Sequence, residues 1–266
     1  MISLESISGL PIFLDGVDLV FGEGLDPVEP DVRRLSDYAS VLAPESELTG
    51  PEDAYFMYRG IARREHGELF KRYNYRYDIT VLRPGIVGRE RIKTIGHYHP
   101  FVPGESVTYP EVYEVLFGRA HYICQRAEGH RALDFIVIEA NPGDKVVIKP
   151  GYGHITINPL EEPLVMSNVT ADGFPSDYRP IARMRGAAYY ELADGSWELN
   201  ERYELAHPPK RASAREVPEF GLTKGTPLYS AITSEPEKFD FLVNPQRYAA
   251  LFERSIELGG VMGVKW

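Results

Sequence analysis

The sequence predicts a mainly β protein built around one antiparallel barrel or sandwich, with an extension at each end. Short runs rich in Val, Ile, Tyr and Thr, broken by Gly, Pro, Asn and Asp, follow one another from residue 73 to about 203. The composition changes on both sides of this region, and its His-x-His motif occurs once. We therefore expect one barrel with decorated ends rather than two barrels.

Residues 1–72 are expected to form an N-terminal extension that packs on the barrel. This region mixes short apolar pieces with polar connections that contain proline. One stretch, "PDVRRLSDYASVL", carries apolar residues on a period of roughly 3.6, which is typical of a helix. These residues are Val32, Leu35, Ala39 and Leu42.

Residues 73–206 are expected to form the barrel itself. The strand-like runs are "YRYDITVL", "EVYEVLFG", "AHYICQR", "LDFIVIE", "DKVVIKP", "HITIN", "PLVMSNV", "AAYYEL" and "SWELNERY". Between them, "EANPGD" and "LADGS" have the residues of hairpin turns and loops.

Residues 207–266 are expected to form a C-terminal extension that includes a helix. A Pro-rich connection leads into "NPQRYAALFERSIEL", where Asn244 suits a helix cap and Pro245 the first helical position. Ala249, Phe252 and Ile256 supply an apolar face.

Composition indicates a soluble protein of the cytoplasm that binds neither nucleic acid nor membrane. Hydrophobic residues make up 43% of the 266 residues and charged residues 26%, and no apolar run reaches the roughly 18 to 20 residues of a membrane span. The N-terminal stretch carries Glu5 and Asp15 without a basic leader, unlike a secretory signal. The net charge of -10 disfavours polyanionic partners but allows a small anionic substrate. The one cysteine, Cys124, excludes a disulfide within the chain and is expected to be a buried apolar residue.

Two histidines in "TIGHYH" form half of a candidate metal site. Side chains alternate faces along a strand, so His97 and His99 point to the same side at a separation that suits one ion. A third histidine, His154, opens a strand after the tight turn that Gly151 and Gly153 permit. It could complete the site.

A glutamate is also available, but the residues alone leave open which one. Glu105 lies in the turn-like "PGES" segment, whereas Glu111 and Glu114 lie in the run "EVYEVLFG". Alternation places Glu111 with Tyr113 on one face of that strand and Glu114 on the other. A glutamate on the interior face is costly unless it is paired or bound to metal, while the remaining glutamate can be solvated.

These motifs resemble those of the cupin superfamily, a family of jelly-roll (double-stranded β-helix) barrels. "GHYH", Glu111 and Gly118 are similar to the first cupin motif, and Gly143, Gly151, His154 and Asn158 to the second, with Lys149 where cupins usually have proline. The resemblance implies that His97, His99, Glu111 and His154 bind one divalent metal ion. Fe(II) is the first expectation, with Mn(II), Ni(II) and Zn(II) as alternatives, and one or two positions stay open for catalysis.

A closer resemblance is to the cupin-type phosphoglucose isomerases, found chiefly in archaea. It rests on "VRRLSD", "TVLRPGIVGRE", "KTIGHYH", "PEVYEVLFG" and "ADG…DYRPIA" and extends over roughly residues 30–203. It implies a homodimeric, metal-dependent enzyme of glycolysis and gluconeogenesis that interconverts glucose 6-phosphate and fructose 6-phosphate. Its partner would be a small sugar phosphate.

The resemblance also implies roles for residues around the metal. Glu111 would shuttle a proton as well as bind the ion. The sugar phosphate would be held by Thr80, Thr94 and Gly96, whose hydroxyls and amide donate hydrogen bonds without adding charge. Further substrate contacts are expected from Tyr113, Tyr55 and Tyr178. Both an enediol route and a hydride shift remain open.

Several features depart from the family. Eleven residues separate His99 from Glu111, more than in the family, so "FVPGESVTY" is expected to form a longer loop over the site. Val169 and Ser176 occupy positions where the family has a tyrosine and a histidine. Two alternatives therefore accompany the isomerase: a non-catalytic sugar-binding or regulatory cupin, and a cupin Fe(II) oxygenase.

Overall fold

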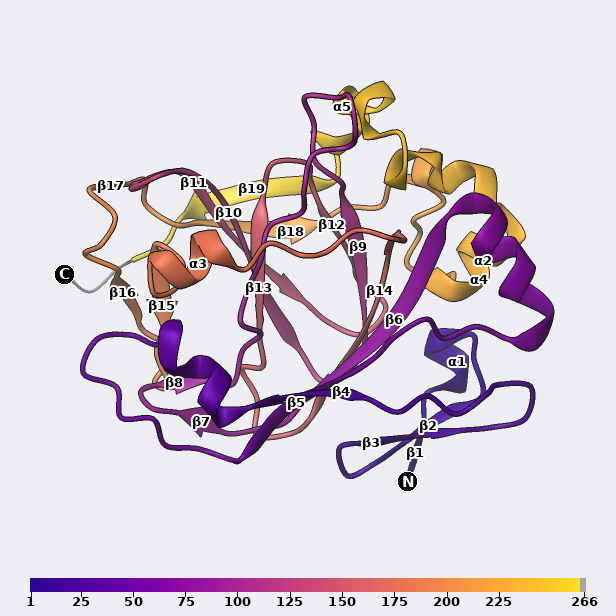
Figure 1. The fold of residues 1–266 in the computed structure, drawn as a ribbon, viewed down its shortest axis with the longest axis horizontal. Coiled ribbons are helices and arrows are strands. Elements are labelled where there is room, and N and C mark those ends of the chain that lie inside the picture. The colour runs from indigo at the N-terminus through magenta and orange to yellow at the C-terminus, as the bar shows by residue number, and fades with distance from the viewer. Residues whose placement is uncertain (264–266) are drawn as a thin grey trace.

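Two six-stranded β-sheets form the centre of the computed structural model, which describes residues 1–263 (Figure 1). The first sheet has the strand order β12-β9-β14-β6-β5-β4. The second has the order β13-β10-β11-β18-β19, with β17 also paired to β11. None of the helices in the described residues is long and apolar enough to cross a membrane.

The barrel is a jelly roll, because the chain passes back and forth between the two sheets. Its strands are β6 (Tyr75–Leu82), β9 (Glu111–Phe117), β10 (Ala120–Glu128), β11 (Arg131–Ala140), β12 (Lys145–Ile148), β13 (Gly153–Ile157) and β14 (Leu164–Ala171). An eighth segment, residues 93–98, bridges to β13 through Lys93–Ile157 and His97–His154. All these neighbours are antiparallel. The predicted jelly-roll barrel is confirmed.

The N-terminal region adds strands to the first sheet and a small sheet beside it. Its elements are β1 (Ile2–Ser3), α1 (Glu5–Ser8), β2 (Ile12–Asp15), β3 (Asp18–Phe21), β4 (Asp31–Arg34), η1 (Leu35–Ser40), β5 (Asp53–Tyr58), η2 (Arg64–His66) and α2 (Gly67–Tyr73). The helix-like pattern over residues 30–42 is only partly realised. Val32 pairs with Phe56 in the sheet, and a 3-10 helix begins at Leu35 after the Asp37 carboxylate accepts the Arg34 N–H.

The segments after β14 decorate the second sheet and cover the first. They are α3 (Arg179–Arg183), β15 (Tyr189–Glu191), β16 (Trp197–Leu199), β17 (Leu205–Ala206), β18 (Lys210–Ala214), η3 (Pro218–Phe220), α4 (Leu228–Ser234), η4 (Pro236–Leu242), η5 (Pro245–Arg247), α5 (Ala249–Phe252) and β19 (Ile256–Val261). A small hairpin, β7 (Ile86–Val87) and β8 (Glu90–Arg91), lies between β6 and the histidine segment.

The predicted C-terminal helix is shorter than its apolar pattern suggested. The 3-10 helix η5 begins at Pro245, Tyr248 leaves helical geometry with φ -124°, and α5 contains four residues. The Asn244 side chain donates to Asp240 instead of capping a helix. Ile256 begins a strand because the β18 edge is available for pairing, so sheet formation overrides the local period.

Strands β6, β9, β12 and β14 of the first sheet are buried on both faces. One apolar cluster fills the barrel, while a second packs the outer face of the sheet against both terminal extensions. In Figure 1 the yellow helix α4 and the purple helix α2 lie beside β6 and β14 on this outer side. Nearly every residue of β6 and β14 is buried, and the polar residues among them, such as Asp78 and Asn168, line the inside of the barrel.

The expectation that the second glutamate of β9 can be solvated is wrong. Glu114 is 1% exposed and forms a 2.7 Å ion pair with Lys145, and its other carboxylate oxygen accepts the Leu228 N–H at 2.7 Å. The C-terminal extension covers this face and supplies the partner. Burial raises the pKa of the Glu114 carboxyl, and the Lys145 ammonium opposes that rise.

Replacing Lys145 by methionine is expected to destabilise the fold by about 3–5 kcal/mol, because Glu114 would stay buried without its counter-charge. This corresponds to a fall of roughly 10 °C in the melting temperature. The control is Lys238→Met, which breaks an exposed pair with Glu235 and should change the melting temperature little. Equal melting temperatures for the two variants would contradict the assigned role of the pair.

Candidate metal centre and substrate cavity

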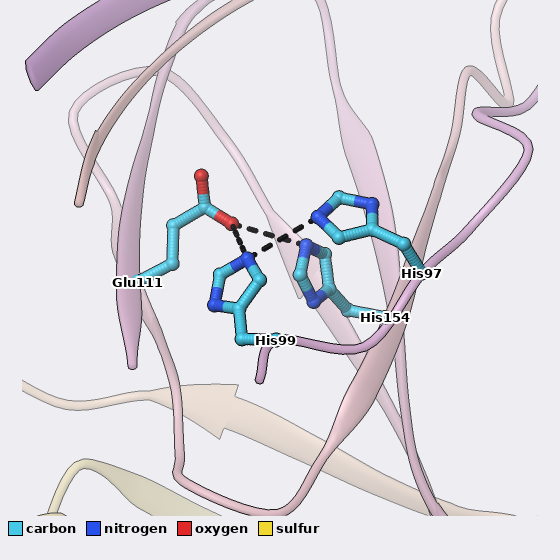
Figure 2. Close-up of side chains that lie close together, drawn as sticks. All are labelled: His97, His99, Glu111 and His154. Atoms are coloured by element: carbon cyan, nitrogen blue, oxygen red, sulfur yellow. Dashed lines mark hydrogen bonds and ion pairs between the residues drawn. The ribbon is translucent and has the colours of Figure 1, made fainter. Parts of the chain in front are cut away.

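Four side chains converge inside the barrel and point toward one another (Figure 2). His97 and His99 come from the segment before β9, Glu111 begins β9, and His154 lies on β13. One ligand atom of each side chain lies within 4.8 Å of the others. The structure thus brings together the four residues expected to bind metal.

Backbone geometry at Gly96 sets the position of the histidines. Gly96 has φ +83°, and a Cβ there would lie 2.4 Å from the Ile155 side chain. Only glycine fits this left-handed conformation and close approach. The next residue, His97, exchanges backbone hydrogen bonds with His154 at 3.3 and 3.0 Å, which places their imidazoles on the same inner surface.

The contacts within the cluster leave one carboxylate oxygen free. Glu111 Oε1 accepts a 2.6 Å hydrogen bond from Asn168, whereas Oε2 is buried without a hydrogen-bond partner among the described residues. That oxygen lies 3.1 Å from His154 Nε2 and 3.5 Å from His99 Nε2. The Nε2 atoms of His97 and His99 are 3.2 Å apart.

A backbone carbonyl orients one of the imidazoles. His99 Nδ1 lies 3.0 Å from the carbonyl oxygen of Tyr109, an acceptor only, so the proton belongs on Nδ1 and the Nε2 lone pair faces the cluster. Hydrogen bonds of this kind hold metal-binding histidines in protein sites. The long connection between His99 and Glu111 therefore supplies a positioning contact.

The surroundings of His97, His99 and Glu111 favour the protonation states that bind cations. Burial lowers the pKa of His97 well below its usual value, assisted by His154 and His99, and lowers the pKa of His99 to about 4. Burial alone would raise the pKa of Glu111, but the close approach of His154, together with His99, outweighs burial and lowers that pKa. At neutral pH, His97 and His99 are neutral and Glu111 is ionised.

The donor set fits a divalent transition metal. Imidazole nitrogens suit Fe, Ni and Zn, and a carboxylate oxygen adds affinity for Mn(II). The buried, unpaired Glu111 Oε2 is costly unless a cation or proton approaches it, and the three imidazoles surround that position. Four protein ligands leave space for substrate on a six-coordinate ion.

A small cavity opens next to the cluster, lined by the inner faces of β5, β6, β9 and β14. All residues expected to contact substrate line this cavity: Tyr55, Thr80, Thr94, Gly96, Tyr113 and Tyr178. Their roles stay predictions, although their convergence on one space next to four candidate ligands is a feature of the fold.

Some of these side chains also have structural partners. The Thr94 hydroxyl accepts the Thr156 N–H at 2.9 Å, and the Tyr55 hydroxyl accepts the Ile95 N–H at 3.3 Å. Tyr178 accepts a 3.4 Å hydrogen bond from Arg33. The Tyr113 hydroxyl lies 3.1 Å from His154 Nε2, and burial raises the pKa of Tyr113 well above its usual value, so this phenol stays protonated.

The two positions that depart from the family lie differently in the structure. Val169 is fully buried in the outer apolar cluster, on the face of β14 that points away from the metal centre. Its neighbours Asn168 and Thr170 line the cavity instead. Ser176 also lines the cavity, near Phe174, which packs edge-on against His99 with ring centroids 4.8 Å apart.

Several further residues line the cavity beyond those expected from the sequence. They are Asn168, Arg59, Arg76 and Asp78. Alternation along β6 predicts two of them, because a strand that turns Thr80 inward also turns Asp78 and Arg76 inward.

The long connection after His99 folds as a hairpin-like loop at the mouth of the barrel. Val102 and Val107 share a backbone hydrogen bond, and Thr108 accepts the Gly151 N–H at 2.7 Å. The loop walls a second cavity of about 790 Å³, which His99 and Ser176 also line. The loop therefore shapes the entrance next to the metal centre.

Comparisons with known proteins place the similarity in the barrel region. The family model of glucose-6-phosphate isomerase matches residues 32–207. The glucose-6-phosphate isomerase of Pyrococcus furiosus is 31% identical over 173 residues, covering 63% of this chain and 84% of that protein. The enzyme of the same name from Thermococcus litoralis is also 31% identical over 173 residues, covering 63% and 83%.

Similar solved structures include oxalate decarboxylase from Bacillus subtilis, at 19% identity and TM-score 0.32, covering 51% of this chain and 34% of that one. Oxalate oxidase in complex with glycolate gives 18% identity and TM-score 0.27, covering 39% and 42%. Overlaps this small decide nothing about this chain.

Proposed function

The chain belongs to the glucose-6-phosphate isomerase family, and from this premise we propose that it interconverts glucose 6-phosphate and fructose 6-phosphate with a divalent metal ion held by His97, His99, Glu111 and His154. The observation that carries the proposal is the position of these four side chains beside a hydroxyl-lined cavity within the matched region. By resemblance, we further propose a homodimer that works in the cytoplasm.

The reaction moves a hydrogen between C1 and C2 of an open-chain sugar. A bound divalent ion would polarise the carbonyl and the neighbouring hydroxyl and so acidify the C–H bond. Glu111 is the group placed to carry the proton in an enediol route, because its carboxylate lines the substrate cavity next to the cluster. In a hydride shift, Glu111 would act as a ligand alone.

Hydroxyls and a phenol would orient the substrate. Thr80 and Thr94 would donate hydrogen bonds to the sugar phosphate, and the protonated Tyr113 would hold an oxygen near Glu111. The polar lining favours a sugar over the apolar substrates expected of the oxygenase alternative. A non-catalytic sugar-binding protein would need the same contacts and is separated from an isomerase only by turnover.

Turnover is expected to depend on metal. Protein stripped with a chelator should lose conversion of fructose 6-phosphate to glucose 6-phosphate in a coupled assay, and Fe(II), Mn(II), Ni(II) or Zn(II) should restore it. The control reaction contains the coupling enzyme and each ion in turn, without this protein. Stoichiometric metal uptake without turnover on either hexose phosphate would overturn the isomerase proposal and support a binding protein.

A further inference from the structure

A charged triad on the cavity wall has no role in the proposed mechanism. Arg76 and Asp78 project from the inner face of β6, and Arg59 follows β5, the next strand of the same sheet. None of the three belongs to the motifs that carry the family resemblance. Asp78 is the buried member of the three, and a buried carboxylate on a cavity wall is costly unless it is paired.

Asp78 orients both arginines. It is 2% exposed, and its Oδ1 accepts the Gly60 N–H at 2.8 Å. The Arg76 Nε lies 3.1 and 3.0 Å from its two oxygens, and Arg59 reaches Oδ2 at 3.4 Å. A carboxylate that is fixed by the backbone thus presets two guanidinium groups, which lowers the entropy cost of binding an anion.

Both arginine side chains are partly exposed to solvent and also line the cavity. The side chains of Arg76 and Arg59 are 26% and 39% exposed, and both line the cavity. Their outer ion pairs are with exposed carboxylates, Asp172 at 3.2 Å and Asp31 at 2.9 Å. Exposed pairs contribute little stability and give way easily to a ligand, unlike the buried contact with Asp78.

The sheet register sets the distance between the triad and the metal centre, and this distance matches the length of a sugar phosphate. Thr170 on the intervening strand pairs with Arg76 on one side and with Glu111 on the other. Arg76 is therefore two strand spacings, roughly 10 Å, from Glu111 on the same inner face. An extended six-carbon sugar phosphate with its carbonyl end at the metal centre spans such a distance.

The charges around the cavity balance for a dianion. Among the residues that line the cavity, the formal charges of Arg59 and Arg76 offset those of Asp78 and Glu111. A divalent ion would then leave an excess of two positive charges. A phosphate monoester carries about -1.5 to -2 at pH 7.

On these grounds we infer that Arg59 and Arg76, oriented by Asp78, recognise the phosphate of the substrate and so select phosphorylated over neutral sugars. The inference rests on the proposed isomerase function for its substrate class. The threonine hydroxyls would add uncharged hydrogen bonds, while the arginines supply the charge that distinguishes a phosphate ester from a hydroxyl.

The kinetic test compares Arg76→Gln and Arg59→Gln with wild type and with Arg64→Gln. Arg64 is an exposed arginine paired with Asp26, so this control makes the same charge change away from the cavity. Each cavity variant should raise KM for fructose 6-phosphate about 10- to 100-fold, the loss of one charge-assisted hydrogen bond, with metal content unchanged and kcat altered little. Arg76→Lys keeps the positive charge but loses the paired hydrogen-bond donors of the guanidinium group. It should therefore give a smaller rise in KM than Arg76→Gln. Unchanged KM in both glutamine variants would overturn the inference.

A binding test separates the inference from the proposed reaction. Calorimetry on metal-loaded protein would compare glucitol 6-phosphate, which lacks a carbonyl, with glucitol. The phosphate should account for most of the affinity in wild type and in Arg64→Gln, and this advantage should shrink at least tenfold in the cavity variants. Such a result in protein without isomerase turnover would support the triad and reject the reaction. An equal phosphate advantage in all variants would reject the triad. Circular dichroism checks folding, and Arg59→Gln, the more exposed site, serves if Arg76→Gln does not fold.

Discussion

Replacing His154 by alanine is expected to abolish stoichiometric metal binding and to reduce turnover at least roughly a thousandfold, since a metal ion contributes several kcal/mol of transition-state stabilisation. The imidazole is 2% exposed and lies 3.1 Å from the unpaired oxygen of Glu111. Its removal takes away one of four donors and leaves a gap next to that oxygen. Elemental analysis of the purified protein and the coupled assay measure the two effects.

The fold should survive this change, because the hydrogen bonds that join His154 to His97 use the backbone. His130→Ala is a matched control, since His130 is exposed and lies outside the cluster. It should keep both metal and rate. Full metal content and full turnover in the His154 variant would remove the site assignment, whatever the behaviour of the control.

The convergence of the four candidate ligands could be predicted from the sequence. His97 and His99 share a face through strand alternation, and motif spacing connects them to Glu111 and His154. The glycine at position 96 has a left-handed conformation that few other residues adopt, so it marks the turn in the sequence as well. Local rules were sufficient for the pair of histidines, whereas the choice of Glu111 among the glutamates came from the family resemblance.

The environment of Glu114 could not be predicted in this way. Its partners are Lys145 on β12 and the backbone of Leu228, which lies over a hundred residues further along the chain. The C-terminal extension determines whether a face of β9 is solvated, because it can cover that face. The amphipathic pattern of the extension does not predict which surface it packs against. Ile256 shows the same dependence on distant partners. Its spacing predicts a helix residue, but in the structure it begins an edge strand.

The residues of the cavity wall could be predicted from the sequence only in part. Arg76 and Asp78 follow from the alternation that turns Thr80 inward, whereas Arg59 enters the cavity because β5 pairs with β6. At position 169 the linear sequence was misleading. The family resemblance places Val169 near the active site, but the strand turns Asn168 inward instead. Family motifs identify positions in the chain, and only strand register assigns them a face.

Replacing Glu111 by glutamine is expected to lower kcat by about 10²- to 10⁴-fold, the range of general acid–base catalysis, while keeping more metal than the His154 variant does. A carboxylate offers two acceptor oxygens, one for Asn168 and one for the centre. An amide offers a single oxygen, so glutamine can satisfy Asn168 or the metal but not both. It also removes the negative charge and the proton acceptor.

The decisive comparison for Glu111 is rate against metal content, with both measured on the same preparation. A fall in kcat that exceeds the fall in bound metal assigns Glu111 a part in proton transfer beyond ligation. Parallel falls would reduce it to a ligand, as a hydride shift requires. Turnover in deuterated water supplies an independent readout, because a proton carried by Glu111 exchanges with solvent and leaves deuterium on C1 or C2, whereas a hydride moves between the carbons without exchange. Because the Glu111 carboxylate lines the substrate cavity, we expect deuterium in the product of the wild-type enzyme and a loss of that exchange in Glu111→Gln.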